Sequence, residues 1–462
     1  MTTTLSVPSL VADALTHYRS ALAPEFATLE KARTGAGDAE FSPAFRLPEP
    51  TAALERFFSV SGIAVADLPD YRGHRLRLLD LMRNPGTRTT KTLASLTIVA
   101  RAVRHITDTG ERIMIVTPSS ANKATALRDA VQRAIACGLV TADQLQITSV
   151  VPAASVAKLW SSALSEDPEL RARNPLVVHD GAEPAAVKDL ATAFVTTHAH
   201  ELRRRYGVRL WYTLGLDNYR AADLLRAFAE RDLLPRTASR THVHSVSSAF
   251  GLLGHDLGHA AVARAGGAPL PSARYFLVQH LGTPDMVLSL RHGSHSRDNL
   301  PTYRRDPGDG LYRQDSDPHF PASTFDPDEQ LDATFYTRRP ATSARMDPLI
   351  AAHGGGGVVV SLHECLSRYA QIRRMLADTG AALPADPRRL REWSLVMALT
   401  GTLNAADRGL LPDSDDVLVH GSGSYTCDDY RPVPAHRRVT ADDAGDLARH
   451  VTAAVRAAAR PA

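Results

Sequence analysis

The chain has 462 residues, which is enough for two or three domains with a sizeable core in each. Its hydrophobic fraction of 44% and charged fraction of 22% are typical of a globular protein. The net charge of +3 is small and the basic residues are scattered, so nucleic acid is not an expected partner. Three distant cysteines argue against a disulfide framework, and no signal peptide or membrane span is recognisable. We therefore expect a cytoplasmic protein without a membrane partner.

In chain order, strands and helices alternate from about residue 92 onward. The expected helices are 9–22, 92–106, 121–138, 185–205, 221–234, 252–267, the second part of 356–380, and 391–410. The expected strands are 112–118, 145–152, 175–181, 208–214, 241–246, 275–279, the first part of 356–380, and 416–424. This alternation predicts an α/β architecture with mainly parallel sheets flanked by helices.

The alternation breaks at about 286–330, where the chain is polar and rich in Pro, Gly, Asp, Arg and His. A long irregular segment inside a compact domain is usually functional or disordered. We interpret it as an insert that forms a lid or specificity loop, with a solvated loop as the plainer interpretation. Side chains of the insert that would suit an anionic substrate are His292, His295, Arg297, Arg304 and Arg305. Arg338 and Arg339 follow it, and the sequence sets no role for them.

Two helix starts carry unusual residues. Lys91 lies in NPGTRTTKTLASL, just before an apolar helix, where the helix dipole disfavours a cation. A lone lysine there is usually solvated, but this position also suits an amine that is kept neutral or forms an imine. The turn PSSAN at 118–122 joins a strand to a helix. Its residues suit an N-cap, and the helix start also suits an anion.

Five segments in order resemble the fold-type-II pyridoxal-phosphate enzymes, most closely threonine synthase and its relatives in the tryptophan synthase β and cysteine synthase superfamily. The segments lie between about residues 78 and 430, and the resemblance is divergent. They are TRTTK ending at Lys91, PSSAN at 118–122, HVHSVSSAFGLLGHDLG at 242–258, the Gly-rich segment 334–366, and DVLVHGSGS at 416–424. The order of these segments is more specific than any one of them.

The resemblance implies two domains with a cofactor cleft between them. Residues 1–83 would be an N-terminal extension packing on the large domain, 84–205 the small domain with the Schiff-base lysine, and 206–462 the large domain with the phosphate loop and the 286–330 insert. The implied cofactor is pyridoxal 5'-phosphate, which acts as an electron sink while the protein supplies attachment, orientation and proton transfer.

The resemblance also implies individual roles. Lys91 would form the Schiff base and then move the α-proton of the substrate. Asn122 would hydrogen-bond the ring oxygen of the cofactor. Ser119, Ser120, Ala121 and Asn122 would hold the substrate carboxylate. Ser247, Ser248, Ala249, Phe250 and Gly251 would wrap the phosphate, and His420 and Ser422 would lie near the pyridine nitrogen.

Three departures from the family pattern affect these roles. The phosphate loop has one glycine, Gly251, where the family has several. Ala121 replaces a glycine in the PSSAN turn, and His420 aligns where the family has Ser or Thr. These changes leave two alternatives: altered chemistry on the same cofactor, or a relative that has lost it. Since Lys91 and Asn122 are retained, the first is favoured.

We therefore expect an enzyme that abstracts the α-proton of an amino acid and continues by β- or γ-elimination or replacement. The departures make housekeeping threonine synthesis unlikely and favour specialised, secondary metabolism. The partner would be a small amino-acid substrate, and a homodimer is left open. One alternative is a non-catalytic relative that acts as a binding partner. Another is a metal-dependent hydrolase that uses His255 and His259, spaced i and i+4 on a helix, with His242 or His244 nearby.

Overall fold

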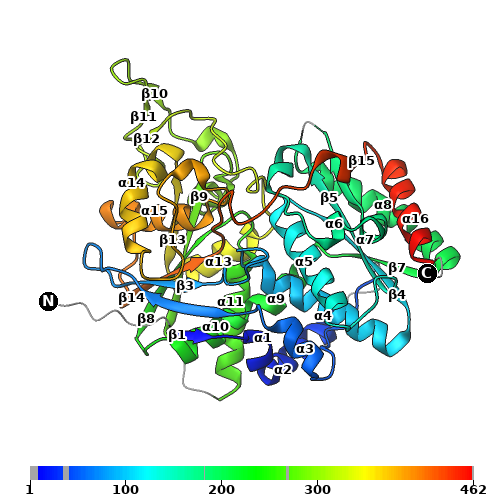
Figure 1. Ribbon diagram of the computed structural model, residues 1–462. Coiled ribbons are helices and arrows are strands. Elements are labelled where there is room, and N and C mark those ends of the chain that lie inside the picture. The colour runs from blue at the N-terminus through cyan, green and yellow to red at the C-terminus, as the bar shows by residue number, and fades with distance from the viewer. Residues whose placement is uncertain (1–8, 35–40, 182, 267–269, 460–462) are drawn as a thin grey trace.

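Two sheets side by side organise the chain in a computed structural model, which describes residues 9–34, 41–181, 183–266 and 270–459 (Figure 1). The larger sheet has the order β1 (Ser9–Val11), β2 (Ile63–Asp67), β3 (Leu76–Asp80), β14 (Asp416–Gly421), β8 (Ser239–Ser245), β9 (Ser272–His280) and β13 (Gly355–Val360). The smaller sheet has the order β15 (Val439–Thr440), β6 (Leu176–His179), β5 (Leu145–Pro152), β4 (Arg112–Pro118) and β7 (Val208–Tyr212).

All strand pairs of the smaller sheet are parallel. In the larger sheet the pairs β1–β2 and β2–β3 are antiparallel, and the other pairs are parallel. Parallel strands covered on both faces are continuously apolar rather than alternating. The eight residues of β5 are all buried, as this rule requires. The expected α/β architecture with mainly parallel sheets is therefore confirmed.

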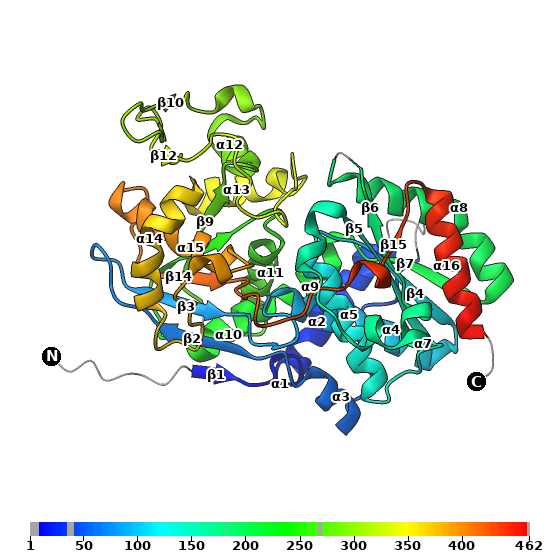
Figure 2. The same cartoon turned by 45° about the horizontal axis from the view of Figure 1, so that its top comes forward.

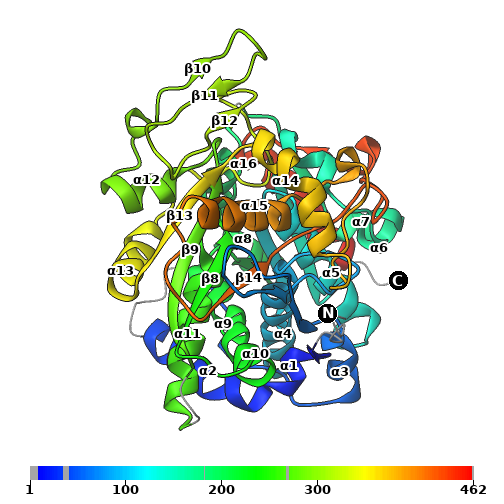
Figure 3. The same cartoon turned by 90° about the vertical axis from the view of Figure 1, so that its left-hand side faces the viewer.

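Helices cover both faces of each sheet. In the smaller half, α8 packs on β4, β5 and β7 and is itself covered by α16, while α4 and α5 lie on the opposite face (Figure 2). In the larger half, α15 packs on β8, β9, β13 and β14, with α14 against it, and α9, α10 and α11 lie on the other side (Figure 3). The helices are α1 (Ala14–His17), α2 (Arg19–Thr34), α3 (Ala52–Phe58), α4 (Lys91–Thr109), α5 (Asn122–Ala136), α6 (Ala163–Glu166), α7 (Pro168–Arg173), α8 (Ala186–Tyr206), α9 (Leu216–Asp223), α10 (Leu225–Leu233), α11 (Phe250–Arg264), α12 (Asp285–His292), α13 (Ser343–His353), α14 (Leu362–Met375), α15 (Ser394–Asp407) and α16 (Ala444–Ala459).

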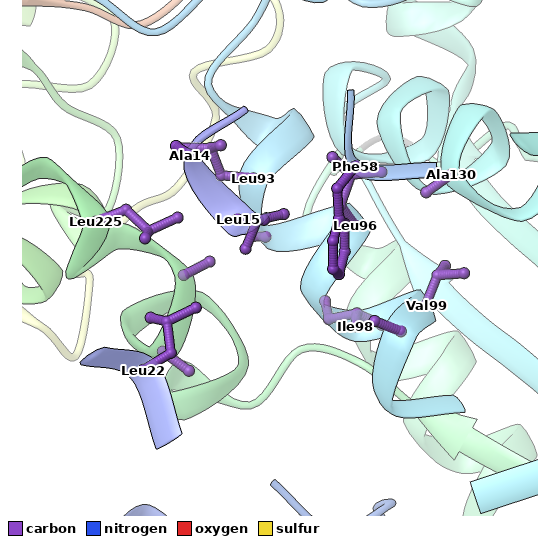
Figure 4. Packing of buried hydrophobic residues seen from close by; sticks show 14 of the residues in the cluster. Ala14, Leu15, Leu22, Phe58, Leu93, Leu96, Ile98, Val99, Ala130 and Leu225 are labelled. Carbon is purple, nitrogen blue, oxygen red and sulfur yellow. The ribbon is translucent and has the colours of Figure 1, made fainter. Parts of the chain in front are cut away.

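Helix α4 is the central element between the two halves. Its residues 92–103 are all buried, which is the pattern of a helix surrounded by protein rather than lying at a surface. Leu93 and Leu96 pack with Leu15 and Phe58 from the N-terminal helices, in one apolar cluster (Figure 4). The helix ends at Gly110, which has a φ of 71°. Because residues 92–103 of α4 are enclosed by protein, the position of its first residue is well defined.

The two halves differ from the expected domain boundaries. β7 belongs to the smaller sheet although it lies after residue 205, because it pairs with β4. β15 and α16 also belong to the smaller half, through pairing with β6 and packing on α8. The extension 1–83, which was expected to pack on the large domain, supplies β1, β2 and β3 of the larger sheet itself. Long-range strand pairing decides these memberships, and it leaves no local signal in the sequence.

Two local expectations also differ from the structure. Residues 9–11 form β1 and not the start of a helix, since they pair with β2, and α1 begins only after Asp13, whose side chain accepts from Thr16 N. The 286–330 insert contains part of α12 and a small antiparallel sheet of β10 (Arg304–Arg305), β11 (Tyr312–Arg313) and β12 (Ser323–Thr324), which projects from the body (Figure 1).

Some expectations fall outside the described residues. These are parts of the N-terminal extension (1–8 and 35–40), residue 267 of the helix expected at 252–267, and residues 268–269 and 460–462 of the large domain. Among the described helices, none is long and apolar enough to cross a membrane. The homodimer that the sequence leaves open stays a prediction.

Candidate active site

A cavity of about 360 Å³ lies between the two halves, where segments from both sheets converge. That volume is within the range of small-molecule binding sites. Its walls come from the start of α4, the β4–α5 turn, helices α8, α9 and α10, the β8–α11 loop, the segment 334–342 and the end of β14. The residues that line it and carry the argument below are Thr90, Lys91, Ser119, Ser120, Asn122, Lys123, Lys188, Tyr219, Asp223, Arg226, His244, Ser247, Ser248, Ala249, Phe250, Gly251, Tyr336 and Ser422.

Lys91 is the first residue of α4 and its side chain lines the cavity. Among the described residues, no hydrogen-bond or ion-pair partner contacts its amine. Burial lowers the pKa of Lys91, Asp223 partly offsets this effect, and Arg226 lowers the pKa further. The positive end of α4 also disfavours the charged form. Burial and the helix end therefore both favour the neutral, nucleophilic form of the Lys91 amine.

The position of Lys91 is set by a contact with the last strand of the larger sheet. Thr90 N donates to Ser422 O at 2.9 Å, and Thr89 bridges to Gly423. The Ser422 hydroxyl lies 3.2 Å from that of Ser245 and lines the cavity. The start of α4 and the end of β14 are therefore joined at one wall of the site.

The turn 118–122 forms a second wall at the start of α5. The Ser119 hydroxyl accepts from Ala121 N at 3.2 Å and from Ala124 N at 2.8 Å, so it caps the helix. Ala121 has a φ of 96°, in the left-handed region that favours glycine. The backbone N–H groups of Asn122 and Lys123 have no partner among the described residues, as expected for a helix start. The turn therefore caps α5 through Ser119, and it also leaves two backbone N–H groups free on residues that line the cavity.

The Asn122 carboxamide is largely engaged by protein groups. It donates to Glu392 Oε2 at 2.6 Å and accepts from the Tyr425 hydroxyl at 2.7 Å. One N–H of the amide remains free of these two bonds. Asn122 therefore lines the cavity with a side chain whose orientation is already set by two buried residues.

The loop 247–251 forms a third wall at the start of α11. Ala249 has a φ of 50° and precedes the first helical residue, Phe250, whose ring lies 5.2 Å from that of Tyr219. Gly251 is required by sterics, because a Cβ there would lie 2.3 Å from Nη2 of Arg226. The single retained glycine thus marks where the loop passes directly over a guanidinium.

Arg226 is the charged residue that sequence analysis missed. It is 1% exposed and lies beneath the loop, where Nη2 ion-pairs with Asp223 Oδ1 at 2.7 Å and donates to the Thr90 hydroxyl at 3.0 Å. The signal available in the sequence was an arginine within the apolar run 224–229. A guanidinium beneath the free N–H groups of a helix start is a favourable setting for a phosphate.

His420 lies behind the cavity and not in its wall. It is fully buried, and Arg226 Nη1 donates to its Nδ1 at 3.0 Å. Because a guanidinium only donates, the other ring nitrogen carries the proton and donates to His242 Nδ1 at 3.1 Å. Burial holds the pKa of His420 well below its usual range, so the ring is neutral. Of the two residues expected near a pyridine nitrogen, Ser422 lines the cavity and His420 supports Arg226.

His255 and His259, which are spaced i and i+4 on α11, do not converge on a shared point. His255 bonds to Glu230 at 2.7 Å and to the Tyr275 hydroxyl at 3.0 Å, whereas His259 bonds to Pro271 O at 2.9 Å. Glu230, His242 and His255 do lie close enough to share a metal. However, Arg240 ion-pairs with the same Glu230 carboxylate, and a cation there disfavours a metal ion.

The insert residues lie away from the cavity. His292, His295, Arg297, Arg304 and Arg305 are not among the residues that line it. Arg338 pairs with Asp285 at 3.5 Å, and Arg339 N donates to the same carboxylate. The segment 334–342 that contains these arginines does line the cavity, through other residues.

The chain is similar to one family in sequence and to several enzymes in structure. The sequence matches the family of unknown function DUF6002 over residues 10–455, so the chain belongs to that family. No curated protein matches the sequence. The pyridoxal-phosphate-bound threonine synthase of Brucella melitensis is similar in structure, with a TM-score of 0.51 and 12% identity over 97% of this chain and 92% of that chain. Threonine synthase of yeast has a TM-score of 0.49 and 10% identity over 98% of this chain and 92% of that chain. The likeness to the Brucella structure confirms the expected fold of the fold-type-II enzymes, with mainly parallel sheets flanked by helices.

Proposed function

We propose that this member of the DUF6002 family is a pyridoxal-phosphate-dependent enzyme that acts on an amino acid. The observation that carries the proposal is the unpartnered amine of Lys91, which shares one cavity with three helix starts. An amine with a lowered pKa is what attachment to an aldehyde requires, because only the neutral form is nucleophilic. The fold shared with the Brucella threonine synthase, which binds this cofactor, supports the same assignment.

The residues present fit the cofactor. Its phosphate needs donors and a positive charge, which the 247–251 loop and Arg226 supply. The close approach at Gly251 leaves no space for a Cβ, in keeping with a loop that packs tightly over the guanidinium. Ser422 would hold the ring nitrogen, and the free amide N–H of Asn122 would hold the ring oxygen.

The cofactor, when bound, supplies the electron sink that stabilises negative charge on the α-carbon of the substrate. Lys91 then has two tasks: its amine attaches the cofactor in the resting protein and accepts the α-proton of the substrate afterwards. A positioned base of this kind contributes roughly 10²- to 10⁴-fold to the rate. The contact between Thr90 N and Ser422 O holds the first turn of α4, and so orients the amine.

The start of α5 would bind the substrate carboxylate. The N–H groups of Asn122 and Lys123 are free, and the helix dipole adds a favourable term of about 0.3–1 kcal/mol for an anion. Ser120 lines the cavity beside them. Ser119 is already committed to capping, so its role is to hold the turn rather than to contact the substrate.

The reaction class that follows is α-proton abstraction and then elimination or replacement at the β or γ carbon. A role in specialised metabolism is supported by the single-glycine phosphate loop, by Ala121 in the carboxylate turn and by the projecting β10–β12 insert. A cytoplasmic location belongs to this proposal as well.

The test is the visible absorption spectrum of purified protein with added pyridoxal phosphate. We expect an absorption band that borohydride reduction fixes covalently on Lys91, as peptide mapping by mass spectrometry would show. Lys91→Ala should lose the band, while Lys31→Ala, a change far from the cavity, should keep it. A parent protein with no band, or with the label on another lysine, would contradict the proposal and favour a binding role.

A further inference from the structure

A second lysine in the cavity has no partner. Lys123 follows Asn122 at the start of α5, is 9% exposed, and lines the same cavity as Lys91. Its Nζ atom is fully buried and makes no hydrogen bond within the described part of the chain. Leaving a charged ammonium buried without a partner is strongly unfavourable. Burial and the nearby Lys91 and Lys188 hold the pKa of Lys123 well below its usual range.

The distribution of lysine in the chain is uneven. Only five of its 53 basic residues are lysines, and three of those five line this cavity: Lys91, Lys123 and Lys188. A guanidinium stays charged when buried, whereas a lysine can lose its proton. Lys91 and Lys123 therefore lie where a buried amine without a partner favours the neutral form. Lys158, by contrast, lies outside the cavity lining and is ion-paired with Asp332 and Glu392.

The cavity has more basic side chains than the proposed cofactor and a simple amino acid would use. Asp223, the one acidic residue among the described residues that line it, is already paired with Arg226. The 247–251 loop with Arg226 accounts for a phosphate, and the start of α5 accounts for an α-carboxylate. Lys91 attaches the cofactor. Lys123 and Lys188 then remain without an anion.

The surroundings of Lys123 offer donors for one more anionic group. Its Nζ lies 5.3 Å from the ring centre of Tyr219 on α9, and the Tyr219 hydroxyl is a second buried group without a partner. Lys188 on α8 also lines the cavity, with its Nζ 5.3 Å from the ring centre of Tyr336. The Lys123 amine and the Tyr219 phenol together suit a singly charged group better than a phosphate dianion.

We propose that Lys123, together with Tyr219, recognises a second carboxylate on the substrate, so that the enzyme acts on a dicarboxylic amino acid. This inference rests on the proposed function. In the empty site Lys123 is neutral. When the second carboxylate enters, the amine takes up one proton from solvent and the resulting ammonium donates to the carboxylate. Recognition is therefore coupled to the uptake of one proton.

The first test compares matched acids and amides on protein loaded with pyridoxal phosphate, by following changes in its absorption band. Aspartate should bind at least tenfold more tightly than asparagine, or glutamate more tightly than glutamine. In Lys123→Met this preference should fall at least tenfold, while Lys31→Met should retain it. Equal binding of acid and amide by the parent, or a preference that survives in Lys123→Met, would overturn the inference.

A second test measures the proton directly. Calorimetric titration of the preferred acid in two buffers with different ionisation enthalpies should show uptake of one proton by the parent and none by Lys123→Met. The variant should fold, because it removes a buried unpaired amine, and its Tm should equal or exceed that of the parent. Lys123→Gln provides a second variant if the methionine chain packs poorly.

These outcomes separate the two proposals. A parent protein without an absorption band would refute the proposed function. A band combined with no preference for acids would refute only the role of Lys123. If Lys123→Met instead weakens pyridoxal phosphate binding and leaves pyridoxal binding unchanged, the lysine serves the cofactor phosphate, and the second-carboxylate inference is wrong.

Discussion

Replacing Gly251 by alanine would place a methyl carbon 2.3 Å from Nη2 and 2.6 Å from Cζ of Arg226. The end of an arginine side chain usually moves aside at little cost. Here it is 1% exposed and bonded to Asp223, Thr90 and His420, so any shift breaks contacts that water cannot replace. Breaking a buried ion pair costs ~3–5 kcal/mol. We therefore expect Gly251→Ala to lower the free energy of unfolding by about 3–5 kcal/mol.

Urea unfolding, followed by fluorescence and circular dichroism, would measure this loss. Gly215→Ala is the matched control, because its Cβ would meet only Asn218 Nδ2 at an ordinary 3.5 Å. In an Arg226→Met background the added methyl should cost less, with a coupling energy of about 1–3 kcal/mol in the double-mutant cycle. If Gly251→Ala unfolds at the same urea concentration as the parent, or if the cycle shows no coupling, the steric argument is wrong.

Two further changes test other parts of the structure. Ala121→Gly should raise stability by about 1 kcal/mol, because the native φ of 96° strains alanine and not glycine; an unchanged Tm would refute this strain. Burial lowers the pKa of His280 from 6.5 to about 4, so the unfolded chain binds one more proton between those pH values. Stability should therefore fall by about 3 kcal/mol as pH drops from 6.5 to 4, and in urea titrations His280→Gln should show a pH dependence that is weaker by one proton.

Local patterns were sufficient to predict the central α/β elements. β4 begins and ends at the predicted residues, and α5 ends close to the glycine that was expected to terminate it. These segments are long or strongly apolar, so their own side chains decide their structure. β2 and β3 were not predicted, because each has five residues and is stabilised by pairing with strands distant in the sequence.

The sequence was sufficient to predict which segments form the site, but not which buried basic side chains lie in it. Lys91, the 118–122 turn and the 247–251 loop were expected in one cleft, and the structure brings all three to one cavity. Arg226 and Lys123 were missed because a single basic residue in a helix is normally solvated. Only the tertiary structure shows that both are buried, since the residues that cover them come from other parts of the chain.

The chain completes the smaller half with its C-terminal segments, and this order affects folding during synthesis. β15 and α16 complete that half, yet they emerge from the ribosome only after the whole larger half has been synthesised. Until then the apolar face of α8 that α16 covers stays open to solvent or to chaperones. The smaller half should therefore reach its final stability only after residues 439–459 have been synthesised. A chain stopped before residue 439 should aggregate, even though it would contain every residue of the proposed active site.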